Sequence, residues 1–178
     1  MADSQSQFND NALTRNSEVF IQKRAQAAFI NWMALTLCCA IFVFVPYFSV
    51  PAPVANRSFS AVEEMNLVLI ISAVMMAVSS LFLRYFVLSA AKLPKLKPDF
   101  DARDLEKTIQ YWFTFSIITW GINESIASLG MVSALNSGQA DRAFPFAIAA
   151  LLLNLMMVPN LRSALSLAGY RPSSQAIN

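Results

Sequence analysis

The sequence predicts an all-α polytopic membrane protein, with four transmembrane helices in a bundle and both termini in the cytoplasm. The chain has 178 residues, of which 56% are hydrophobic and only 13% charged, whereas soluble domains carry about 25% charged residues. Its charges separate four apolar windows, each long enough for a helix to cross about 30 Å of hydrocarbon. The windows are continuous apolar runs without the alternation of a β-barrel, so helices are expected throughout.

The four expected spans cover residues 28–49, 65–91, 108–137 and 143–162. The first lies in an uncharged window between Arg24 and Arg57, and the prolines of "VPYFSVPAPVAN" are expected to end it. A charged, proline-bearing loop, Lys92 to Asp104, separates the second span from the third. A short turn then leads to the fourth, where Pro145 suits the first turn of a helix.

The remaining segments are polar. Residues 1–24 form an N-terminal tail, which is either an interfacial helix leading into the first span or an ordinary charged anchor. Residues 25–168 make up the transmembrane domain, and residues 169–178 form a short C-terminal tail. The chain is therefore expected to hold one membrane domain between two polar tails.

The positive residues predict the orientation of this domain. Of the 13 Lys and Arg, only Arg57 and Arg142 fall on one side, which leaves 13 − 2 = 11 on the side of the tails and the middle loop. Positive residues concentrate on the cytoplasmic side of membrane proteins. Both termini should thus be cytoplasmic, and we expect a bacterial inner membrane.

Composition excludes several classes of function. The chain has no His, and its two cysteines, Cys38 and Cys39, are adjacent in an apolar run, so neither a metal site nor a His-based catalytic triad can be assembled. A net charge of +2 without an aromatic-interleaved basic stretch gives no support for nucleic-acid binding. We expect neither an enzyme nor a cofactor.

One carboxylate, Glu124, lies in the middle of the third window. It is 124 − 107 = 17 residues from Lys107 and 141 − 124 = 17 from Asp141, which at about 1.5 Å per residue is roughly 25 Å from either charge. A charge at the bilayer midplane costs about 2.5–3.5 kcal/mol. No cation is expected at that depth, so we expect a mostly neutral carboxyl that faces protein.

The surroundings of Glu124 suggest supporting groups and close packing. The polar groups expected near it in depth are Ser125, Asn123, Asn154, Ser72 and Ser79. Small residues also recur at four-residue spacing in this span, Gly121 with Ser125 and Gly130 with Ala134. Such spacings let helices approach closely in membranes, so Gly121, Gly130 and Ala134 are expected to be helix-packing positions.

The segment "ESIASLGMVSAL", Glu124 to Leu135, resembles the ion-binding helix of the c subunit (proteolipid) of rotary ATP synthases. In both, an acidic residue is followed by apolar and small residues, a glycine six positions later and a Val/Ala/Leu tail. The resemblance implies that Glu124 carries a proton or sodium ion and that Ser125 helps to bind sodium. It is confined to the third span and, loosely, the hairpin leading to it, and the glycine-rich first helix of that family has no equivalent here.

Two principal hypotheses follow. The first is an integral membrane scaffold or complex subunit, in which Glu124 organises helix or subunit packing. The alternative is a proton- or cation-responsive subunit similar to the c subunit, with Glu124 as the ion-binding group. A small four-helix transporter is the third. The expected partners are the lipid bilayer, further copies of the chain or a membrane complex, and, under the alternative, a proton or sodium ion.

Overall fold

The chain folds into helices. The computed structural model describes residues 2–49, 59–88, 94, 96 and 102–170, and no strand occurs among them. In chain order the elements are α1 (Ala2–Ser49), α2 (Phe59–Phe82), a π-helical turn η1 (Leu83–Val87), α3 (Ala102–Ser137), a 3₁₀ turn η2 (Ala140–Ala143), α4 (Phe144–Met156) and α5 (Leu161–Leu167). The all-α prediction is confirmed.

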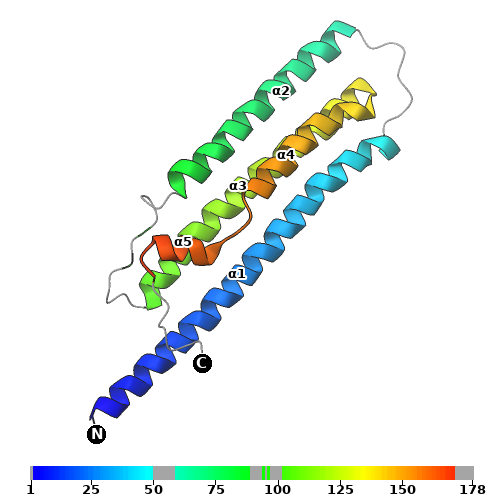
Figure 1. The fold of residues 1–178 in the computed structure, drawn as a ribbon. Coiled ribbons are helices and arrows are strands. Elements are labelled where there is room, and N and C mark those ends of the chain that lie inside the picture. Colours follow the sequence, from blue (N-terminus) through cyan, green and yellow to red (C-terminus); the bar gives the residue numbers. More distant parts are fainter. Residues whose placement is uncertain (1, 50–58, 89–93, 95, 97–101, 171–178) are drawn as a thin grey trace.

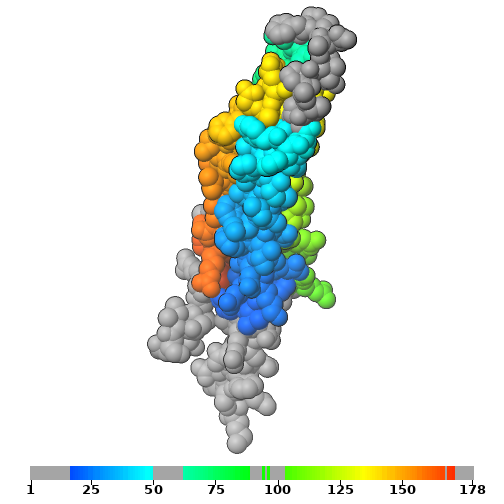
Figure 2. All heavy atoms as spheres, turned by 90° about the vertical axis from the view of Figure 1, so that its right-hand side faces the viewer, coloured from blue at the N-terminus to red at the C-terminus, as the bar shows by residue number. Residues whose placement is uncertain are grey.

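The helix α3 is central to the arrangement. It packs against α1, α2 and α4, and α1 also packs against α4. Figure 1 shows α1 and α2 along opposite edges of an elongated molecule, with α3 and α4 between them. Viewed from the side, α1 runs along the length of the molecule, with α4 beside it (Figure 2). Among the other long helices, α2 packs mainly against α3.

The first three helices contain most of the first three expected spans. The helix α1 continues through Pro46 to Ser49, and the other two prolines expected to end it lie outside the described residues. The expected N-terminal tail is helical from Ala2 and forms the first part of α1. The second span ends in η1 at Val87, and α3 includes the whole of 108–137.

The window expected as the fourth span is not one helix. The 13 residues of α4 rise about 20 Å at 1.5 Å per residue, and the helix ends at Met156. Pro159 explains the break, because proline donates no N–H and disfavours helical backbone in the residue before it. A new helix, α5, begins at Leu161 and is capped by Asn160, whose side chain accepts a hydrogen bond from the Ser163 N–H at 3.0 Å.

Among the described residues, two helical segments are long and apolar enough to cross a membrane, Ser17–Ser49 with 33 residues and Val62–Val87 with 26. Only 17% of the most apolar window of each is buried inside the protein, which is unlike a soluble core helix. The exposed large apolar side chains of α2 and η1 include Leu67, Val68, Ile71, Val74, Met75, Val78, Phe82, Tyr85 and Phe86. Apolar surface of this extent is typical of contact with lipid or another protein.

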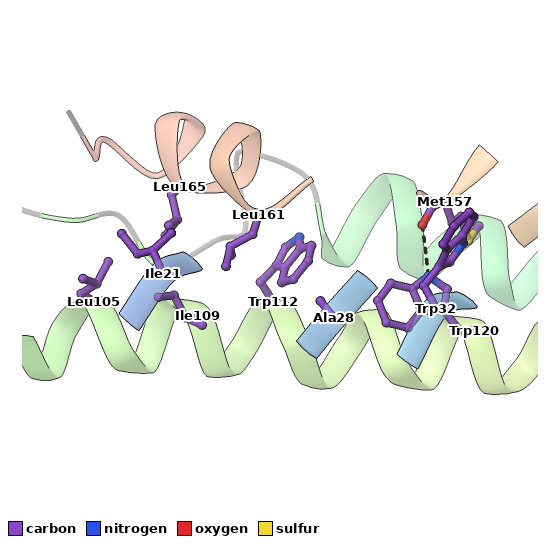
Figure 3. Close-up of a cluster of buried hydrophobic side chains, with 10 residues drawn as sticks. All are labelled: Ile21, Ala28, Trp32, Leu105, Ile109, Trp112, Trp120, Met157, Leu161 and Leu165. Atoms are coloured by element: carbon purple, nitrogen blue, oxygen red, sulfur yellow. Dashed lines mark hydrogen bonds between the residues drawn. The ribbon is translucent and has the colours of Figure 1, made fainter. Parts of the chain in front are cut away.

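The buried side chains form two apolar clusters along the bundle. The basal cluster, shown in Figure 3, joins α1, α3 and α5 with Met157. Its members are Ile21, Ala28, Trp32, Leu105, Ile109, Trp112, Trp120, Met157, Leu161 and Leu165. The apical cluster joins α1, α2, α3 and α4 through Cys39, Ala73, Ile126, Ala127, Phe146, Ala147, Ala150 and Leu153. Along α3, the clusters are separated by the turn between Trp120 and Ile126.

Candidate functional site

A layer of buried polar groups lies where the two clusters meet. It contains one side chain from each of four helices: Cys39 of α1, Ser80 of α2, Asn123 of α3 and Asn154 of α4. All four residues are 0% exposed. Because unpaired polar groups are costly to bury, the hydrogen bonds of this polar layer determine whether any of its groups is left for another partner.

The polar layer is joined by a chain of hydrogen bonds. The Ser80 hydroxyl donates to Asn123 Oδ1 at 2.6 Å, and Asn123 Nδ2 donates to Asn154 Oδ1 at 2.8 Å. Asn154 Nδ2 in turn lies 3.5 Å from Cys39 Sγ, which accepts its hydrogen bond. The Met157 sulfur, 3.6 Å from Asn123 Nδ2, is a further weak acceptor. These bonds connect α2 to α3, α3 to α4 and α4 to α1.

Two tryptophans complete the polar layer at the end of α4. A helix C-terminus leaves its last four carbonyls without intrahelical partners, and here the helix ends among buried side chains. Trp32 Nε1 of α1 donates to the Asn154 carbonyl at 2.9 Å, and Trp120 Nε1 of α3 donates to the Met157 carbonyl at 3.1 Å, as drawn in Figure 3. The indoles therefore stabilise the break in the fourth window.

Glu124 lies outside this layer although it follows Asn123 in sequence, because adjacent residues on a helix point about 100° apart. Its side chain is half-buried. Within the described part of the chain, its carboxylate has no hydrogen-bond or ion-pair partner. The Cys39 thiol is close enough for an electrostatic interaction with the carboxylate but does not bond to it. The carboxylate is not joined to Asn123 or Asn154.

The three serines expected to support Glu124 bond to their own helices instead. Ser125 donates to the Gly121 carbonyl at 2.9 Å. Ser72 and Ser79 each donate to the carbonyl four residues earlier, both at 2.8 Å. Of the expected supporting groups, the structure thus brings together only Asn123 and Asn154, and it brings them to each other.

The small residues of α3 have different surroundings. A Cβ on Gly130 would lie 2.6 Å from Phe146 Cβ and 2.9 Å from the Ala143 carbonyl oxygen, so α4 can approach this closely only at a glycine. Ala134 is 0% exposed. A Cβ on Gly121, in contrast, would meet nothing within 4 Å, which leaves open space on α3 one turn before Glu124.

Sequence reasoning missed Ser80, Cys39 and both capping tryptophans as members of the polar layer. Ser79 and Ser80 are adjacent, and only the packing of α2 on α3 shows which one is buried. The tryptophans carried a usable signal: Trp32 and Trp120 lie inside apolar windows, whereas membrane tryptophans concentrate at the interfaces. A buried indole usually finds a partner for its N–H.

Over its described residues the protein is an all-helical bundle with a buried layer of uncharged polar groups at its centre, and two of its helices are long and apolar enough to cross a membrane. Over the described residues, no cluster of three or more His, Cys, Asp or Glu could hold a metal ion. The chain matches no protein-family model, no curated protein and no solved structure in our comparisons.

Proposed function

We propose that this chain is an integral membrane scaffold or complex subunit, in which the polar layer holds the helices of one copy together and Glu124 contacts a neighbouring subunit. One observation carries the proposal: the polar layer satisfies its own hydrogen bonds, whereas the half-buried Glu124 carboxylate has no partner among the described residues. Assembly would supply that partner.

The membrane is the first partner in this proposal. The exposed apolar side chains of α1 and α2 favour contact with lipid. In the proposed arrangement α1, α2, α3 and the α4–α5 segment cross the bilayer as a four-helix bundle, with both termini in the cytoplasm of a bacterial cell. The indole bonds at the end of α4 support this placement, because non-helical backbone at membrane depth must be satisfied by protein.

The surface of α3 around Glu124 leaves room for a helix of a neighbouring subunit. The open space at Gly121 allows another backbone to approach closely. A charged carboxylate at the bilayer midplane costs about 2.5–3.5 kcal/mol, so the neutral carboxyl is favoured, and its hydroxyl donates a hydrogen bond. Interhelical bonds of this kind average about 0.6 kcal/mol, which is enough to select a partner or register without dominating stability.

The experiment measures the mass of the purified protein in nanodiscs for wild type, Glu124→Gln and Glu124→Leu. We expect the wild type and the Gln variant to assemble equally, because both side chains donate a hydrogen bond, and the Leu variant to assemble about threefold more weakly, the factor that corresponds to about 0.6 kcal/mol. Glu64→Gln, an exposed carboxyl near the start of α2, is the matched control and should assemble. A monomeric wild type, or assembly of the Leu variant equal to wild type, overturns the proposal.

A second candidate function is the proton- or cation-responsive subunit, favoured by the unpartnered state of the Glu124 carboxylate. Its experiment is labelling by a hydrophobic, carboxyl-reactive carbodiimide across pH, with and without sodium. This candidate predicts labelling that falls with rising pH, is slowed by sodium and disappears in Glu124→Gln. Labelling of Glu124 that is independent of both pH and sodium contradicts it.

A further inference from the structure

A surface cavity lies between α1 and α3, near the ends of these helices that hold Arg24 and Glu106. Its volume is about 270 Å³. The polar part of its wall consists of Arg24 from α1 and Glu106, Gln110 and Thr114 from α3, all of them exposed. The apolar part consists of Phe20, Ile109 and Phe113. Ile109 belongs to the basal cluster, so this side of the cavity is anchored in the core (Figure 3).

The cavity lies at the boundary between charged and apolar sequence. Arg24 is the last charge before the apolar window of α1, and Glu106 and Lys107 are the last charges before that of α3. In the proposed membrane arrangement, on which this inference rests, that boundary is the level of the cytoplasmic lipid headgroups. Phe113 and Thr114 follow one to two helical turns deeper.

The cavity wall carries two opposite charges that do not pair with each other. The guanidinium of Arg24 lies 5.3 Å from the centroid of the Phe20 ring, and no ion pair between Arg24 and Glu106 is formed in the described structure. At the same level, Lys107 and Asp104 pair with each other at 3.7 Å. Arg24 is therefore available to an anion and Glu106 to a cation, across one cavity.

We propose that this cavity binds the headgroup of a zwitterionic phospholipid with a primary ammonium, of the phosphatidylethanolamine class. The phosphate bonds to the Arg24 guanidinium, which presents paired N–H donors to such oxygens. The ammonium donates to the Glu106 carboxylate. Gln110 and Thr114 supply further hydrogen bonds near the glycerol, and an acyl chain follows Phe113 toward the apolar part of the bundle.

The same chemistry discriminates against other headgroups. A choline headgroup has no N–H to donate to Glu106, and quaternary ammonium groups favour aromatic faces, whereas the Phe20 ring here is already next to Arg24. A glycerol headgroup leaves the lipid with a net negative charge beside the Glu106 carboxylate. The site is thus expected to prefer ethanolamine over both.

The test is native mass spectrometry of the full chain released from detergent with ethanolamine, choline or glycerol phospholipids of identical acyl chains. We expect wild type to bind the ethanolamine lipid about tenfold more tightly than the choline lipid, the effect of one charge-assisted hydrogen bond. Glu106→Gln should reduce that ratio to near one, and Arg24→Gln should weaken all three lipids. Glu63→Gln, an exposed carboxyl on α2, should leave the ratio unchanged.

Equal binding of the ethanolamine and choline lipids by wild type overturns the proposal, as does an ethanolamine preference that survives in Glu106→Gln. Since Arg24 and Glu106 are exposed and form no ion pair within the described part of the chain, their variants should keep the thermal unfolding midpoint of wild type, which checks folding. The same spectra report the number of copies per particle. Loss of lipid selectivity with normal assembly contradicts this site alone, whereas a wild-type monomer contradicts the function proposed for Glu124.

Discussion

The Asn123 side chain uses both ends of its amide in the polar layer. Its oxygen accepts from Ser80 of α2, and its nitrogen donates to Asn154 of α4. Ser128, by comparison, donates only to the carbonyl of Glu124 in its own helix, at 3.2 Å. Two polar residues of α3 that look equivalent in sequence therefore have different energetic roles.

Asn123→Ala should lower the free energy of unfolding by about 1–3 kcal/mol, because it leaves the buried Asn154 amide oxygen without its donor and the Ser80 hydroxyl with only the weak acceptor Met157 Sδ, 3.7 Å away. Thermal unfolding in detergent measures the change. Ser128→Ala is the control and should shift stability by less than about 0.5 kcal/mol. Equal effects of the two substitutions would show that the polar layer contributes nothing specific.

Tyr170, beyond the end of α5, makes a contact distant in sequence. Its hydroxyl donates to Glu18 Oε1 of α1 at 2.8 Å. Burial, together with this hydrogen bond to a carboxylate, raises the pKa of Tyr170 to about 12. The neutral phenol is therefore favoured in the folded chain.

The raised pKa of Tyr170 predicts a pH dependence. The stabilisation it provides should be fully present below about pH 10, the ordinary pKa of a tyrosine, and should be lost as the pH rises through the folded value. Tyr170→Phe should thus unfold at a lower temperature than wild type at pH 8, with the difference shrinking above pH 10. A difference that stays constant to pH 12 would contradict this account. In Glu18→Gln, the pKa of Tyr170 should fall partway toward 10.

At the scale of the helices, α3 determines how closely its neighbours approach. Its contact with α4 depends on the missing side chain at Gly130, and its contact with α2 includes two buried hydrogen bonds. One is Ser80 to Asn123, and the other is Ser133 to Asn66 Oδ1 at 2.8 Å. Asn66 precedes Ser80 in α2, whereas the partner of Asn66, Ser133, follows the partner of Ser80, Asn123, in α3. The two helices are therefore antiparallel.

Gly130→Ala and Gly121→Ala form a matched pair. The first places a methyl group against the Phe146 Cβ and the Ala143 backbone, so overpacking should cost about 1–3 kcal/mol. The second meets open space within the chain and should stabilise the helix by up to about 1 kcal/mol. Chemical or thermal unfolding of each variant provides the measurement. A stabilising Gly130→Ala would show that α3 and α4 are not in close contact.

At the level of the whole molecule, the proposed orientation rests on the positive residues. Eleven of the 13 Lys and Arg fall on the side expected to hold the tails and the middle loop, and the positive-inside rule predicts that Arg57 lies on the outer side. In this orientation, the end of the bundle that holds α5 and the Glu18–Tyr170 contact would face the cytoplasm.

Reporter fusions check this topology. A reporter active only in the cytoplasm should be silent when fused after Arg57 and active when fused after Lys97 or at the C-terminus. A periplasmic reporter should give the opposite pattern. Cytoplasmic activity after Arg57 would overturn the proposed orientation.

The all-α class and most of the helices could be predicted from the sequence, because the length of an apolar run acts locally. The proline signal was less reliable, since α1 continues through Pro46. The sequence also identified Asn123, Asn154 and the packing role of Gly130 as candidates. We expected one helix across the fourth window although Pro159 is visible there, because the sequence does not show whether the backbone at such a break finds partners. The structure shows that it does: the indoles of Trp32 and Trp120 donate to the carbonyls of Asn154 and Met157.

Which polar groups meet became clear only from the packing of the helices. Depth along a span can be counted in residues, but the face of a helix that meets a neighbour depends on how all the helices pack. For that reason Ser80 and not Ser79 is buried, and Asn123 bonds with Asn154 while Glu124, one residue later, points elsewhere. The carboxylate that stands out most in the sequence has no hydrogen-bond or ion-pair partner among the residues that the structure describes.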